Sequence, residues 1–185
     1  MKICFKKQGF TLIETVFALL IISMGFLSVF SLVQDSIRAT NSSINRLIAA
    51  NLAQEGVEII RNIRDSVYAE GDEWDTIVDD NHLNQYECLV TAKNCRVEAN
   101  ANYRNQLLDL NDGAFLKIDS ITNQYNYSSG DDSIFKRWIN LNQGGGICSQ
   151  IATSTDCIKI DIIISWQERG NDQELEVEDY LYNWY

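Results

Sequence analysis

Two hydrophobic patterns follow one another in the first third of the chain. The segment Thr15–Val33 contains 19 residues and no charged side chain. As a helix with about 1.5 Å rise per residue it would be roughly 28 Å long, close to the hydrocarbon thickness of a membrane. After it, apolar residues recur at spacings of three, four and seven, which predicts that the helix continues in amphipathic form to about residue 68. This stripe contains Ile37, Ile44, Leu47, Ile48, Leu52, Ile59, Ile60, Ile63 and Val67.

From residue 69 the sequence changes to Gly, Asp, Asn and Ser with scattered aromatic residues, which predicts loops and short strands. The clearest strand is 158–166, where isoleucines alternate with mostly polar residues. Turn-forming residues at 169–172 predict a hairpin whose second strand covers 174–184. Two further strands are expected at 114–118 and 134–141. The predicted fold class is therefore α+β, with a long N-terminal transmembrane and amphipathic helix packed on a small antiparallel β-sheet head.

The charge distribution indicates how the chain is oriented in a membrane. The 15 basic and 26 acidic residues give a net charge of −11, but residues 1–9 carry three lysines and no acid. The remainder, with 12 basic and 26 acidic residues, therefore has a charge of −14. The positive-inside tendency predicts a cytoplasmic N-terminus and an extracytoplasmic body. Because that body repels phosphate backbones, direct nucleic-acid binding is not expected.

The residues before the apolar segment, KKQGFTLIE at positions 6–14, resemble the N-terminus of type IV prepilins and type II secretion pseudopilins. In that family a membrane peptidase cuts after the glycine and the new terminal residue is N-methylated, which implies processing at Gly9 and Phe10. The family glutamate, fifth after the cut, corresponds to Glu14. The resemblance implies a pilin fold with a basic leader (1–9), a long helix (10–68) and an extracytoplasmic head (69–185). Within the helix, 10–33 would be the transmembrane and filament-core part, and 34–68 the amphipathic part.

Glu14 has a physical reason to take part in assembly. Cleavage would leave a cationic amine on Phe10, one helical turn before the Glu14 carboxylate. In a bundle of staggered helices, the amine of one subunit can pair with Glu14 of a neighbour, and breaking such a buried pair costs about 3 kcal/mol. The partners implied are other pilin or pseudopilin subunits, the prepilin peptidase and the inner-membrane assembly platform.

The absence of proline separates this chain from many major pilins, whose helix carries one near the end of its apolar part. The sequence is more similar to PilV-like minor pilins or to an I-type pseudopilin. It predicts a filament subunit held first in the cytoplasmic membrane and then in a pilus or pseudopilus. The alternative is a signal-anchored extracytoplasmic binding module that never polymerises. A membrane-tethered hydrolase is disfavoured, because the single histidine, His82, has no evident nucleophile partner.

Five cysteines are present, and Cys4 lies in the basic segment. The other four, Cys88, Cys95, Cys148 and Cys157, suggest disulfides in an oxidising compartment. Three pairings are possible, and we favour the local one, 88–95 and 148–157, because each pair brackets a polar, turn-like segment. Zinc is the alternative, although these spacings differ from those of CxxC knuckles. No metal or other cofactor is expected.

Three other segments suggest ligand-binding loops but fit poorly. The glycines at 144–146 lack the Lys-Ser/Thr that follows in a phosphate-binding loop. The segment 109–113 is similar to the start of a calcium loop, but its glycine comes one residue early and Ser120 replaces the closing glutamate. The acidic residues between 72 and 80 are interpreted as a solvated loop face. None of these segments is a predicted site.

Overall fold

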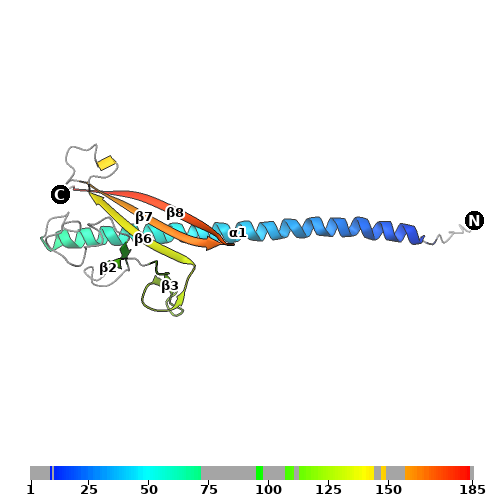
Figure 1. Ribbon diagram of the computed structural model, residues 1–185, viewed down its shortest axis with the longest axis horizontal. Helices are drawn as coiled ribbons and strands as arrows, with labels where there is room; N and C mark the ends of the chain where they lie inside the picture. The colour runs from blue at the N-terminus through cyan, green and yellow to red at the C-terminus, as the bar shows by residue number, and fades with distance from the viewer. Residues whose placement is uncertain are drawn as a thin grey trace, which may run out of the picture. The chain divides into compact units, whose positions relative to one another are not determined.

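The structure is a computed structural model, and it describes residues 9, 11–71, 95–97, 107–110, 113–143, 147–148 and 157–183. The chain divides into two compact units, Met1–Ile44 and Asn45–Tyr185. Figure 1 shows the elements by label, with the helix in blue to green and the C-terminal strands in orange to red.

Helix α1 extends over Leu12–Ala69, compared with the predicted 10–68. It begins after Thr11, whose side-chain Oγ1 accepts a hydrogen bond of 3.3 Å from the backbone N–H of Glu14. This is an N-cap, which satisfies one of the backbone donors left free in the first turn. The helix ends before Gly71, where a φ of 91° lets the chain leave the helix and the glycine N–H bonds to the Tyr68 carbonyl at 3.0 Å.

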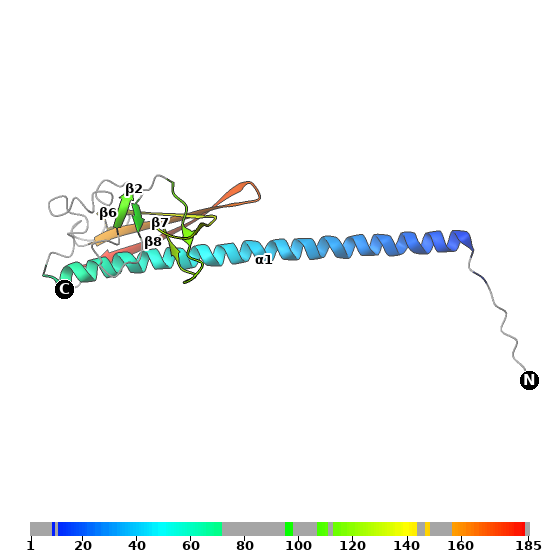
Figure 2. The same cartoon turned by 90° about the horizontal axis from the view of Figure 1, so that it is seen from below.

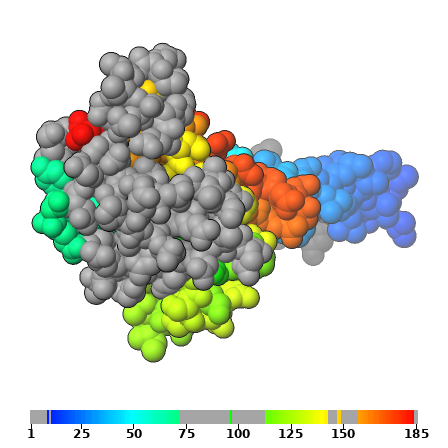
Figure 3. All heavy atoms as spheres, turned by 60° about the vertical axis from the view of Figure 1, so that its left-hand side comes forward, coloured from blue at the N-terminus to red at the C-terminus, as the bar shows by residue number. Residues whose placement is uncertain are grey.

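The main sheet of the second unit has five antiparallel strands in the order β2-β1-β6-β7-β8. Their bounds are Cys95–Val97 (β1), Leu107–Leu110 (β2), Phe135–Gln143 (β6), Cys157–Glu168 (β7) and Asn171–Tyr182 (β8). A second sheet, of order β4-β3-β5, is made from Lys117–Ile118 (β3), Tyr125–Asn126 (β4) and Asp131–Asp132 (β5). In Figure 3 this smaller sheet forms a green to yellow-green patch on the surface.

Strands β7 and β8 form a long hairpin with a two-residue turn. Glu168 pairs with Asn171, so the turn consists of Arg169 and Gly170, with φ values of 56° and 78°. Positive φ at both central residues is typical of a type I′ turn, whose twist matches that of the strands. The prediction of a second strand at 174–184 was wrong at both ends, because Asn171 and Asp172 already belong to the ladder and β8 ends at Tyr182.

The core of the second unit lies between the sheet and the part of α1 that begins at Asn45. Helix residues from Ala49 to Val67 pack against the alternate isoleucines of β7, which are fully buried, as the alternation predicted. Figure 2 shows this part of the helix running along the sheet. At Gly56 an added Cβ would lie 3.0 Å from Ile162 and 3.2 Å from Ile139, so the missing side chain permits the close approach. The predicted α+β arrangement is confirmed.

The core face of β6 includes a buried cation, Arg137, which is 1% exposed. Its Nη1 donates to the Leu52 carbonyl oxygen at 3.0 Å and to the Glu55 carboxylate at 3.1 Å, which compensates for its loss of water. The hydroxyl of Tyr127 donates to the Arg137 carbonyl at 2.8 Å. These bonds connect the helix, the main sheet and the segment after β4.

Two strand predictions need correction. The strand expected at 114–118 is reduced to Lys117–Ile118, and Leu116 instead exchanges backbone hydrogen bonds with Ser133 and Phe135. Gly113, with a φ of 88°, turns the chain immediately before this segment. The strand expected at 134–141 covers Phe135–Gln143, which continues to pair with β7 at its far end.

Candidate processing and assembly site

The predicted processing site lies immediately before α1. Gly9 is exposed and outside the helix, and apart from its chain neighbours no described residue lies within 4 Å of the position a Cβ would take. Phe10 lies outside the described residues. Thr11 is the N-cap, and Glu14 is the third residue of the helix, with its side chain exposed. The junction therefore precedes a helix whose start is fixed by Thr11.

Glu14 occupies a favourable position in the first turn of α1. A carboxylate there interacts with the positive end of the helix dipole, typically worth about 0.3–1 kcal/mol. The sequence Thr11-Leu12-Ile13-Glu14 also has the T-x-x-E spacing of a capping box, although the bond found is that from the Glu14 N–H to Thr11. Thr11 was not among the residues predicted to have a role, and this spacing was the signal that could have identified it.

The first 33 residues of α1 are not buried by any other part of the chain that the structure describes. No residue from Thr11 to Ile44 is buried, and the apolar side chains from Leu12 to Val33 are 45% to 83% exposed where they are large. By length and composition this part of the helix can cross a membrane, and its most apolar window is 0% buried. A surface this apolar requires lipid or another protein around it.

Three of the four hydroxyl side chains between Thr15 and Val33 bond to the helix itself. Thr15, Ser23 and Ser28 donate to the carbonyls of Leu12, Leu20 and Met24 at 2.8, 2.9 and 3.0 Å. Such bonds satisfy the hydroxyl donors without water, so these residues can enter an apolar environment. Glu14 is the only charged residue between Leu12 and Val33.

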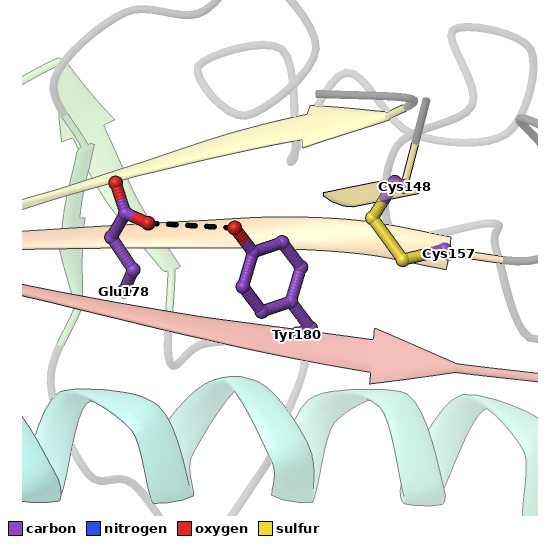
Figure 4. Close-up of a disulfide and its surroundings, with 4 residues drawn as sticks. All are labelled: Cys148, Cys157, Glu178 and Tyr180. Carbon is purple, nitrogen blue, oxygen red and sulfur yellow. Dashed lines mark hydrogen bonds between the residues drawn. A yellow bond between two sulfur atoms is a disulfide. The ribbon is translucent and has the colours of Figure 1, made fainter. Parts of the chain in front are cut away.

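Of the predicted disulfide residues, the structure joins Cys148 and Cys157, both fully buried, with a Cα–Cα distance of 5.3 Å. Figure 4 shows the bridge at the start of β7, with Tyr180 and Glu178 of β8 nearby. Cys88 lies outside the described residues, and Cys95 is described only as a backbone position in β1. The bridge closes a loop in the second unit.

Several other residues considered in the sequence analysis cannot be placed in a site. His82, the acidic segment 72–80 and the glycines at 144–146 lie outside the described residues. Asp109 lies in strand β2, which is unlike the beginning of a calcium-binding loop.

Among the described residues, three carboxylates are close enough to suggest a metal site. Oxygens of Asp161, Glu176 and Glu178 lie within 4.8 Å of one another on β7 and β8. The Lys159 ammonium already binds there, 2.8 Å from Asp161 and 2.7 Å from Glu178. Its hydrogen bonds to these two carboxylates raise the pKa of Lys159, and the bond from Lys159 lowers the pKa of Glu178. The cluster is thus an ion-pair network around a lysine.

Comparison with known proteins gives one match. Residues 4–30 match the prokaryotic N-terminal methylation motif, a span that includes Gly9, Phe10 and Glu14 and more than half of the charge-free segment. Neither a curated protein nor a solved structure matches the chain. Proteins of the pilin-like class to which this motif points are typically structural and without enzymatic activity. The chain thus carries a prepilin-type N-terminal methylation motif at the start of a pilin-like α+β fold.

Proposed function

We propose that this protein is a structural subunit, a minor pilin or pseudopilin, of a type IV pilus-like filament. The observation that carries the proposal is the methylation motif at residues 4–30, on a chain whose apolar helical segment is not buried within the described residues. The prepilin peptidase would cut after Gly9, and Phe10 would be methylated. No catalytic role is proposed.

The exposed helix supports storage in a membrane followed by assembly. Burying one large aliphatic or aromatic side chain contributes roughly 1.5–3 kcal/mol, and more than a dozen such side chains of α1 are exposed before Gln34. Lipid can cover them while the subunit waits, and the helices of neighbouring subunits can cover them in a filament. Transfer between the two environments then conserves most of this stabilisation.

Glu14 supports a defined register between subunits. In the apolar interior of a filament a lone carboxylate is costly, and so is the lone amine of a processed Phe10. Pairing the amine of an incoming subunit with Glu14 of a neighbour removes both costs. Only one axial offset between the two helices brings these charges together. A register displaced by a few residues leaves both charges unpaired.

The assignment to the minor class rests on the sequence. A proline in the apolar helix, present in many major pilins, is missing, and Gly25 with its serine neighbours gives only mild weakening of the helix. The partners proposed are other pilin or pseudopilin subunits, the prepilin peptidase and the inner-membrane assembly platform. The subunit would reside in the cytoplasmic membrane with its leader in the cytoplasm and its head outside, and later in the filament.

The test is the N-terminal peptide of the native protein, purified from membranes or from sheared surface filaments and identified by mass spectrometry. The proposal expects a first residue Phe10 that carries one additional methyl group. A bulky residue in place of Gly9 should leave the uncut form in the membrane. A native start at Met1, or a cut beyond Val33, would overturn the proposal in favour of a signal-anchored or secreted binding module.

A further inference from the structure

The face of the main sheet opposite α1 carries a cavity of about 520 Å³ near the β7–β8 turn. On β6, Lys136 and Trp138 alternate with the buried Phe135, Arg137 and Ile139, so they lie on the opposite face. Ser165 pairs with Lys136 on one side and with Glu174 on the other, which places these three residues in a row across the sheet. Figure 3 shows the hairpin end of β7 and β8 in orange at the surface.

Ile134 and three aromatic side chains, Phe115, Trp138 and Trp166, form the apolar part of this cavity. Phe115, from the segment before β3, is 42% exposed, and the half-buried Trp138 comes from β6. The Lys136 ammonium lies 4.4 Å from the centroid of the Phe115 ring, a cation–π contact that holds the lysine at the cavity wall. The cavity therefore has exposed ring surface beside a positioned hydrogen-bond donor.

The polar groups of the cavity include both donors and acceptors. Lys136 supplies N–H donors, Ser165 a hydroxyl, and Asp172 and Glu174 supply carboxylate oxygens. Within the described residues Glu174 makes no ion pair, and Asp172 accepts a bond of 3.4 Å from the neighbouring Gln167 amide. One positive and two negative side chains leave the site with little net charge, in contrast to the strongly acidic chain around it.

We propose that this cavity binds a neutral saccharide. Each sugar hydroxyl both donates and accepts, which suits an ammonium, a hydroxyl and two carboxylates placed together. The C–H face of a sugar ring is apolar and can cover exposed aromatic surface. A cationic ligand would meet Lys136, and an anionic ligand would meet Asp172 and Glu174. The volume lies within the range of small-molecule sites, and the inference goes beyond the proposed filament function and does not depend on it.

The experiment uses the full chain in phospholipid nanodiscs, because detergents with sugar headgroups would compete. Saturation-transfer NMR is recorded with the neutral disaccharides N,N′-diacetylchitobiose, lactose, maltose and mannobiose in turn, and with tetralysine as a cationic probe. The expected result is saturation of at least one disaccharide and none of tetralysine. Phe115→Ala and Glu174→Gln should each weaken its binding about tenfold, since an aromatic contact or a charge-assisted hydrogen bond is lost.

The matched control is Glu176→Gln, an exposed residue one position further along the same face of β8 and outside the cavity. It should keep wild-type affinity. Both cavity residues are exposed, so their substitution should leave the thermal unfolding temperature unchanged, and this is measured alongside. The proposal is overturned by absence of saturation for all four disaccharides, by unchanged affinity in both cavity variants, or by binding of tetralysine alone.

Discussion

At the scale of single residues, Glu14 carries the sharpest prediction. Glu14→Ala should be cut and methylated normally yet be lost from filaments, because an unpaired amine in the filament interior costs about 3 kcal/mol. Immunoblots of sheared filaments and of membranes measure the assembled and the membrane-stored subunit, respectively. Glu14→Gln separates the charge from the helix-start role, since glutamine also suits the third position of a capping box. If Gln restores incorporation, the pairing argument fails and helix initiation explains the residue.

The control for Glu14 is Asp35→Ala. Asp35 is also an exposed acid of α1, 3.2 Å from Arg38 in a surface ion pair that is worth little. This variant should enter filaments at the wild-type level. If the Asp35 and Glu14 variants were lost from filaments to the same extent, the cause would be a general effect of charge on the helix.

Glu178 gives a prediction about pH. The hydrogen bond from Lys159 lowers the Glu178 pKa below its ordinary value of 4.5. The folded state therefore holds this proton less tightly than the unfolded state, and the stability gained is present above pH 4.5 and lost as the pH falls through the folded pKa. The thermal unfolding temperature is measured from pH 7 to pH 3. It should fall by less in Glu178→Gln than in the wild type as the pH is lowered.

Because Glu178 is exposed, the expected difference is small, and a matched control is needed. Glu174→Gln, on the same face of β8 and without an ion pair among the described residues, should follow the wild-type pH curve. Identical curves for the Glu178 variant and the wild type would show that the bond to Lys159 contributes nothing to stability.

At the scale of elements, the contact between α1 and the sheet depends on Gly56. Gly56→Leu would drive a side chain into the space where Ile162 and Ile139 already lie 3.0 and 3.2 Å from the Cβ position. Overpacking of this kind typically destabilises by about 1–3 kcal/mol. Gln54→Leu adds the same side chain at an exposed position of the same helix and should be nearly neutral. The stabilities of the two variants are compared by their denaturant midpoints of unfolding. An unchanged midpoint in Gly56→Leu would contradict the packing described.

How far the sequence predicted the elements depended on their length. The long helix and strand β7 were predictable, because their apolar periods extend over many residues. The β4-β3-β5 sheet was not predicted, since strands of two residues carry no period. The predicted hairpin turn, 169–172, was two residues too long, because Asn171 and Asp172 are turn-forming residue types but pair in the ladder.

Tertiary contacts decide other features that local patterns cannot. Arg137 is in phase with the buried residues of β6, and its burial depends on the Leu52 carbonyl and Glu55, 85 and 82 residues away. The processing and assembly residues were found through the N-terminal motif alone. The cavity on the outer face was not predicted, since it joins Phe115 to residues of three strands that only the fold brings together.

At the scale of the whole molecule, the two units differ in what stabilises them. Every buried residue of the described chain lies at Ala49 or beyond, whereas the apolar residues before Ile44 have no contacts that bury them. The first unit thus depends on lipid or another protein to cover its apolar surface. The second unit contains its own core, its described disulfide and its ion pairs.

This division predicts that a fragment of residues 45–185 folds without a membrane. It keeps the buried helix residues, both described sheets and the Cys148–Cys157 bridge, and it removes the exposed apolar segment. When it is produced in an oxidising compartment, it should be a soluble monomer in size-exclusion chromatography without detergent, and it should unfold cooperatively. The matched comparison is residues 11–185, which should aggregate unless detergent or lipid is added.

The same fragment tests what the disulfide contributes. With nine residues of sequence separation, the loop-closure model assigns the bridge about 2–3 kcal/mol, so reduction should lower the unfolding temperature without abolishing the fold. A fragment that is soluble but unfolded when oxidised would mean that the core needs the first unit. A fragment that folds and unfolds cooperatively would mean that the second unit reaches its own stable structure without the first, because its core, its disulfide and its ion pairs lie within residues 45–185.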